Sequence, residues 1–129
     1  MAFNITLLTQ YLDECNIQYQ MNEEAVCFEF NGIPLYGYVW GTSAFDSCLS
    51  IVLPGVCNVS PFETKQYMKL INRLNYEFHL VKFTFDENNN LIIVGDVPLD
   101  SSPELDDLVP GLVKLLVEAL NAIKEAIGK

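Results

Sequence analysis

Alternating hydrophobic and polar residues mark several stretches of the chain, and such alternation predicts β-strands with one buried face. In the stretch 24–30, Val26, Phe28 and Phe30 point one way. Asn31-Gly32 follows and is a strong hairpin signal, because both residues tolerate positive φ. Leu91–Val97 is almost continuously apolar, which favours burial on both faces. The strands predicted on these grounds are 24–30, 33–40, 47–53, 77–85 and 91–97.

Apolar residues spaced by three and four predict three helices. The first covers Thr6–Cys15, the second runs from Ser60 to about Asn75, and the last follows Ser101 and extends to Ile127. Each of the two later helices begins with a serine followed three residues on by glutamate, the pattern of a capping box. Pro110 lies inside the last helix and is expected to kink it or to split off its first turn.

The predicted order of elements is α-β-β-β-α-β-β-α, within one domain spanning residues 1–129. A three-stranded meander, a crossing helix and a hairpin define an α+β fold with a mostly antiparallel five-stranded sheet. We expect the first and last helices, which are both amphipathic, to cover one face of the sheet. The second helix is expected to lie apart from them.

The chain carries 17 acidic residues against seven basic ones, a formal charge of −10. This charge argues against binding to nucleic acid or to anionic membranes, because both require basic surfaces. We also expect no membrane span, since no stretch approaches about 18 consecutive apolar residues. The N-terminal stretch lacks the features of a signal peptide. The four dispersed cysteines are expected to be reduced and mostly buried, in a cytoplasmic protein.

Residues with catalytic or metal-binding potential are sparse in this sequence. His79 is the only histidine and lies within an apolar alternation, where a structural or surface role is more usual than catalysis. Cys15, Cys27, Cys48 and Cys57 lack the spacing of a zinc site. The acidic turn at 86–90 lacks the glycine and final glutamate of a calcium loop. We therefore expect a protein that is not an enzyme and carries no cofactor or metal.

Two surface features could carry a function. Tyr36, Tyr38 and Trp40 alternate on one face of a strand. If that face meets the helices, these side chains belong to the core. If it is the face without helices, they form an aromatic patch for a partner.

The second feature is the basic stripe formed by Lys65, Lys69 and Arg73 on the second helix. Such a stripe is either a solvated face or an electrostatic contact with the acids of a second subunit. Ile71 and Leu74 form an apolar stripe beside it. These five residues are the predicted dimer interface.

The sequences KLINRLNYEFHLVKFTFDENNNLIIVGDVPL and PGLVKLLVEALNAI resemble corresponding parts of the YbjN-like bacterial proteins, which are labelled sensory transduction regulators. In those proteins a helix ending in a leucine-asparagine pair, here Leu74-Asn75, leads into a hairpin and then a long helix. The resemblance implies a type III secretion chaperone-like fold. It also implies a non-enzymatic, homodimeric protein- or peptide-binding module, chaperone-like or regulatory, that holds a client segment on a hydrophobic patch.

An alternative is a small-molecule-binding sensory regulator. In that interpretation Tyr36, Tyr38 and Trp40 would line an apolar pocket between the sheet and the helices.

Overall fold

The computed structural model describes residues 5–23, 25–40, 48–60, 62–78, 80–99 and 105–127. His79, residues 41–47 between two predicted strands, and the predicted capping box at 101–104 lie outside these residues. The described helices are α1 (Ile5–Glu14), α2 (Thr64–Glu77) and α3 (Leu105–Ala126). The strands are β1 (Tyr19–Asn22), β2 (Ala25–Phe30), β3 (Ile33–Trp40), β4 (Cys48–Asn58), β5 (Val81–Phe85) and β6 (Asn90–Pro98).

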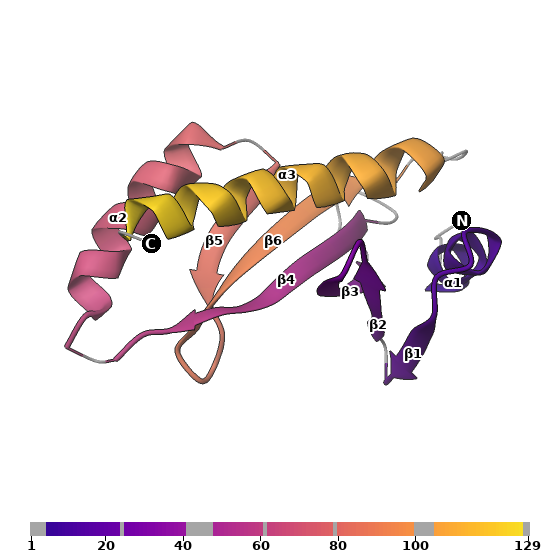
Figure 1. The fold of residues 1–129 in the computed structure, drawn as a ribbon, viewed down its shortest axis with the longest axis horizontal. Coiled ribbons are helices and arrows are strands. Elements are labelled where there is room, and N and C mark those ends of the chain that lie inside the picture. The colour runs from indigo at the N-terminus through magenta and orange to yellow at the C-terminus, as the bar shows by residue number, and fades with distance from the viewer. Residues whose placement is uncertain are drawn as a thin grey trace.

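The strands form one antiparallel sheet in the order β1-β2-β3-β4-β6-β5, as Figure 1 shows. The predicted α+β fold is therefore confirmed, with one strand more than expected. The additional strand, β1, pairs with β2 and is short, polar and mostly exposed. It lacks the apolar alternation on which the prediction depended.

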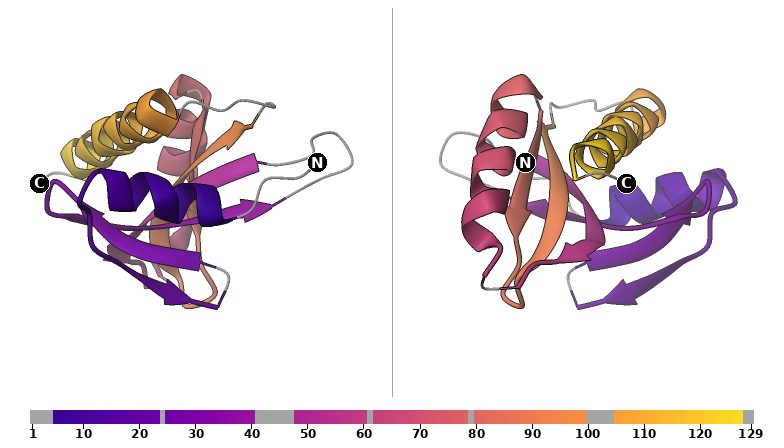
Figure 2. Two further views of the ribbon diagram at one scale, coloured as in Figure 1. Left: turned by 90° about the vertical axis from the view of Figure 1, so that its right-hand side faces the viewer. Right: turned by 60° about the vertical axis from the view of Figure 1, so that its left-hand side comes forward.

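The helices α1 and α3 cover the same face of the sheet, as predicted (Figures 1 and 2). The long helix α3 packs chiefly on β6 and β4, while α1 lies over β2 and β3. A Cβ atom added at Gly95 in β6 would lie 2.9 Å from the Leu112 side chain, so α3 approaches the strand closely there. The core between the layers includes Leu12, Ile51 and Ile93, all fully buried.

The helix α2 lies along the edge strand β5 instead of over the centre of the sheet (Figure 2). It extends to Glu77, so the following strand begins only at Val81 and is shorter than predicted. Its first turn also starts later than expected: Glu63 is the N-cap residue, and its carboxylate accepts a hydrogen bond from the Ser60 hydroxyl at 3.1 Å. Ser60 is therefore not the helix cap.

The described residues also exclude one of the two outcomes expected at Pro110 and extend one predicted strand. The helix α3 continues through Pro110 from Leu105 to Ala126, so no separate first turn splits off, and the expected kink stays a prediction. The strand β4 continues beyond Leu53 to Asn58, and an irregularity between Leu53 and Cys57 lets it pass Pro54 and Gly55. A bulge of this kind adds residues to one strand while its pairing resumes afterwards.

Candidate functional site

The strand β3 directs three aromatic side chains away from the helices. Leu35 is buried in the core, and a Cβ added at Gly37 would meet Leu8 of α1 at 2.9 Å. Successive side chains of a strand point to opposite faces. Tyr36, Tyr38 and Trp40 therefore lie on the other face of the sheet, so they are not part of the core between sheet and helices. They therefore cannot line a pocket between the sheet and the helices. The alternative function of a small-molecule-binding sensory regulator depended on these residues lining such a pocket, and it loses that support.

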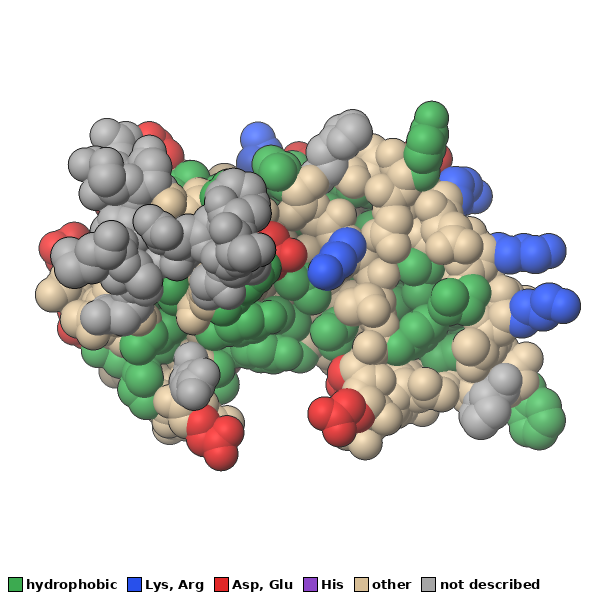
Figure 3. Space-filling view, turned by 180° about the vertical axis from the view of Figure 1, so that it is seen from behind, with side chains coloured by type: hydrophobic (Ala, Val, Ile, Leu, Met, Phe, Trp, Pro, Cys, Tyr) green, Lys and Arg blue, Asp and Glu red, His purple; other side chains and the backbone are tan. Residues whose placement is uncertain are grey.

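We call this second face the open face, because no described helix packs on it. Strand register and alternation place further apolar residues there, and Figure 3 shows a band of hydrophobic side chains across it. The Tyr36 and Tyr38 rings stack with their centroids 6.5 Å apart. Val52 is almost fully buried although it belongs to this face. The residues of the open face include Gln20, Cys27, Glu29, Pro34, Tyr36, Tyr38, Trp40, Cys48, Ser50, Val52, Pro54, Lys82, Ile92, Val94 and Asp96.

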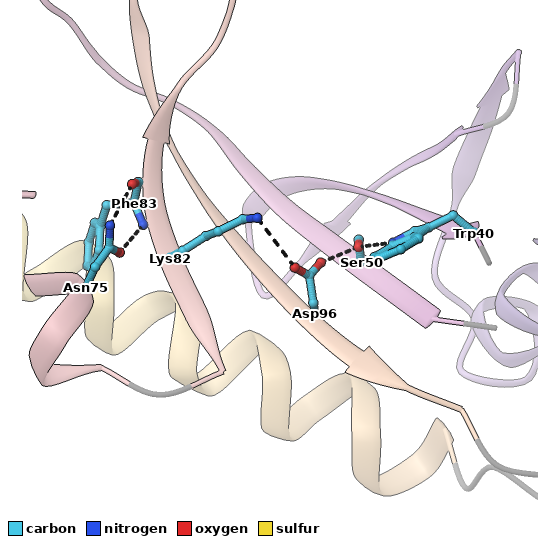
Figure 4. A network of polar contacts seen from close by, with 6 residues as sticks. All are labelled: Trp40, Ser50, Asn75, Lys82, Phe83 and Asp96. Carbon is cyan, nitrogen blue, oxygen red and sulfur yellow. Dashed lines mark hydrogen bonds and ion pairs between the residues drawn. The ribbon is translucent and has the colours of Figure 1, made fainter. Parts of the chain in front are cut away.

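A chain of polar contacts crosses four adjacent strands of the open face (Figure 4). The Trp40 indole Nε1–H donates to Ser50 Oγ at 2.6 Å. The Ser50 hydroxyl in turn donates to Asp96 Oδ1, and Lys82 Nζ lies 4.0 Å from Asp96 Oδ2. Ser50 is completely buried, and its hydroxyl both accepts a hydrogen bond from Trp40 and donates one to Asp96. The network therefore holds the Trp40 ring in a defined position, while 37% of the residue's surface remains exposed.

The Cys48 thiol and the Tyr36 hydroxyl of this face favour their neutral forms at pH 7. Burial and the nearby Asp96 carboxylate raise the pKa of the Cys48 thiol. Burial, Tyr38 and Asp86 raise the pKa of Tyr36. A neutral thiol is a weak nucleophile, because the thiolate is the reactive form. Among the described residues, the Ser50 hydroxyl contacts the Asp96 carboxylate and the Trp40 indole. No described histidine contacts this hydroxyl as a general base would. This arrangement suits binding through aromatic and polar contacts.

A shallow hollow of about 810 Å³ adjoins the aromatic residues near β1. Its open-face lining includes Gln20, Cys27, Glu29, Pro34, Tyr36 and Pro54. Figure 3 shows a notch at the lower edge of this face with acidic side chains on both sides. The hollow therefore combines apolar side chains with the Glu29 carboxylate next to Tyr36.

The predicted interface residues of α2 separate into two groups. Ile71 and Leu74 are buried in the core of the same chain. The outer side of the helix exposes Lys65, Lys69 and Arg73. There the Arg73 Nε atom lies 3.9 Å from Glu77 Oε2. The dimer contact itself stays a prediction, but the two apolar residues contribute to the subunit core.

Several residues of these surfaces escaped the sequence analysis. Ser50 and Asp96 come together only through the pairing of β4 with β6, which no sequence pattern revealed. Phe62 and Tyr76 are almost fully exposed and flank the basic stripe of α2. Their spacing from Lys65, Lys69 and Arg73 could have identified them. The cysteines were only partly predicted: all four are free, but Cys15 and Cys27 are exposed.

The described residues contain no cluster of three or more metal-ligating side chains. No helix among them is long and apolar enough to cross a membrane. These observations leave the open face, its hollow and the outer side of α2 as candidate sites.

Comparison with known proteins identifies the fold. No protein-family model matches the chain, and no curated protein matches it in sequence. Among solved structures, it is similar to YbjN from E. coli, described as a candidate transcription regulator, with a TM-score of 0.66 and 13% identity over 96% of both chains. It is also similar to an uncharacterized protein from Methanothermobacter thermautotrophicus, with a TM-score of 0.60 and 15% identity over 98% of this chain and 100% of that one.

The chain therefore has a YbjN-like fold, which confirms the structural part of the resemblance. At this level of identity the likeness concerns the fold alone. A shared fold does not define a function, which depends on the chemistry of the open face and of α2.

Proposed function

We propose that this protein is a non-enzymatic binding module, chaperone-like or regulatory, that holds an extended protein or peptide segment on the open face. The observation that carries the proposal is the outward position of Tyr36, Tyr38 and Trp40 on a face without a described helix. Aromatic side chains in this setting are typical anchors of protein interfaces. The similarity to a candidate transcription regulator supports a regulatory role.

The order of the aromatic rings supports binding further. The Trp40 indole is held by the Ser50 hydroxyl, and Tyr36 stacks on Tyr38. Side chains that are already fixed lose little conformational entropy when a partner binds, so more of the contact energy appears as affinity. The open face is thus organised before the partner arrives.

We propose that the protein acts as a homodimer through the outer side of α2. Lys65, Lys69 and Arg73 would contact acidic residues of a second copy, and the exposed rings of Phe62 and Tyr76 would add apolar area. The net charge of −10 makes acidic surface abundant on that second copy. The four unpaired cysteines support a reducing, cytoplasmic setting.

Sedimentation equilibrium tests the dimer. A variant with Lys65→Gln, Lys69→Gln and Arg73→Gln should keep its fold, because these side chains are exposed, and should dissociate at higher protein concentration than the wild type. An unchanged dimer would exclude this surface. Charged substitutions at Ile71 or Leu74 are unsuitable for the test, because they would disrupt the subunit core.

A peptide array tests the binding function. Wild-type protein is incubated with overlapping peptides of varied composition, alongside a Tyr36→Ser, Tyr38→Ser variant and a control, Met68→Ser, at an exposed apolar residue outside the open face. We expect some apolar peptides to bind both the wild-type protein and the control variant. These peptides should not bind the variant that lacks Tyr36 and Tyr38. Absence of any peptide whose binding depends on the two tyrosines would overturn it.

A further inference from the structure

Acidic groups surround the aromatic residues of the open face, and their negative charge favours a positively charged partner. Glu29 lines the hollow beside Tyr36, and Asp86 is close enough to influence the Tyr36 hydroxyl. Asp96 lies at the other end, beside Trp40 and Ser50. Lys82 is the one basic residue that the described strands place on this face. The face is therefore both aromatic and acidic.

The polar network fixes the position of Asp96 relative to Trp40. A single hydroxyl, that of Ser50, bridges the indole nitrogen and the carboxylate. A cation that approaches Asp96 from solvent therefore arrives next to the indole ring. Arginine and lysine side chains are attracted both to carboxylates and to the faces of aromatic rings. The two groups together form a recognition point for such a side chain.

Lys82 shows that this carboxylate accepts an ammonium group. Its Nζ lies 4.0 Å from Asp96 Oδ2, and the lysine side chain is 61% exposed. Exposed ion pairs of this geometry are weak, so a partner's cation can compete for the carboxylate at little cost. Lys82 then acts as an internal competitor of the incoming side chain.

We propose that the open face binds a basic extended segment of another protein, in which arginine or lysine residues alternate with apolar ones. This inference rests on the proposed function and names the partner's chemistry. The apolar side chains of an extended segment would contact Tyr36, Tyr38 and Val52. Its basic side chains would pair with Asp96 near Trp40 and with Glu29 at the hollow. The net charge of −10 strengthens the attraction at low ionic strength.

Three octapeptides provide the test. Each alternates leucine with one other residue: arginine in the first, glutamine in the second and glutamate in the third. Trp40 is the only tryptophan of the chain, so its fluorescence reports binding at this face directly. We expect the arginine peptide to bind at least about tenfold more tightly than the glutamine peptide. The difference should shrink as salt is added, because salt screens exposed charges.

Two variants locate the effect and should act in opposite directions. Asp96→Asn keeps an oxygen that accepts from Ser50 but loses the charge, so it should weaken binding of the arginine peptide about tenfold. Lys82→Gln removes the competitor and should strengthen that binding. The matched control is Glu118→Gln on the exposed side of α3, which changes net charge equally but lies on the other side of the sheet. It should leave the affinity within about twofold of wild type.

The outcomes separate this inference from the proposed function. Tighter binding of the glutamine or glutamate peptide, or equal effects of Asp96→Asn and Glu118→Gln, would overturn the basic partner while leaving a binding face. Failure of all three peptides to bind would count against both proposals. A Trp40 emission shift that depends on protein concentration without peptide would identify a second copy as occupant and overturn the inference.

Discussion

The Asn75 side chain closes the edge of the sheet at Phe83. Its Nδ2 donates to the Phe83 carbonyl oxygen at 3.1 Å, and its Oδ1 accepts from the Phe83 backbone N–H at 2.6 Å (Figure 4). The amide thus takes the place of a neighbouring strand beside β5. Unpaired strand edges promote association with other chains. Leu74 is buried next to it, so the leucine-asparagine pair fixes α2 against both the core and the sheet edge.

Asn75→Ala should destabilise the protein by about 1–3 kcal/mol, because it leaves the Phe83 N–H and carbonyl without their partner. Urea unfolding followed by circular dichroism measures the change. The control is Asn72→Ala on the same helix, where the side chain is exposed. Its effect should stay within about 0.5 kcal/mol. Equal effects of the two substitutions would contradict the role assigned to Asn75.

Gly95 and Gly111 should respond to alanine with opposite signs. At Gly95 the added methyl group would lie 2.9 Å from Leu112 Cγ and Cδ1, so Gly95→Ala should cost about 1–3 kcal/mol. At Gly111, within α3, nothing beyond the adjacent residues and the helix's own backbone lies within 4 Å of the added Cβ. There alanine should stabilise the helix by roughly 1 kcal/mol. Thermal unfolding of the two variants tests the packing of α3 on β6, and a stabilising Gly95→Ala would contradict it.

Tyr11 should make the protein sensitive to alkali. Burial and the neighbouring Cys15 raise its pKa from 10.0 to about 12. The folded state therefore holds this proton more tightly than the unfolded state. The resulting stability is complete below pH 10 and is lost as the pH rises from about 10 to 12. Unfolding free energies at pH 8 and pH 11 should differ less for Tyr11→Phe than for wild type; equal differences would contradict this assignment.

Ser50→Ala tests the order of Trp40. The substitution removes the group that accepts from the indole and donates to Asp96. We expect a loss of about 1–3 kcal/mol in stability and weaker near-ultraviolet dichroism from tryptophan, because the ring loses its fixed orientation. Cys48→Ala is a control on the same strand and face that leaves the hydrogen bonds intact. An unchanged tryptophan signal in Ser50→Ala would contradict the ordering of this ring.

The sequence predicted most of the fold because its strands and helices have clear periodicity. Leu49, Ile51 and Leu53 alternate regularly, and α3 has a broad apolar stripe, so both elements were recognised. The strand β1 was missed because its short sequence, Tyr-Gln-Met-Asn, is mostly exposed and depends on pairing with β2. Local periodicity carries no information about such a strand.

The site was predictable only in part. Alternation grouped Tyr36, Tyr38 and Trp40 on one face, but it could not decide which face the helices cover. The contact of Ser50 with Asp96 joins residues far apart in the chain and depends on the register of β4 with β6. Register follows from the packed sheet and is not visible in either strand alone.

The most direct test of the binding face is a nuclear magnetic resonance cross-saturation experiment with the tightest peptide from the array. Saturation of the peptide protons should reduce the signals of Tyr36, Tyr38 and the Trp40 indole most strongly. The outward signals of α3, including that of Glu118, should be unaffected. A peptide that binds and transfers saturation only to α1, α2 or α3 would contradict the assignment of function to the open face.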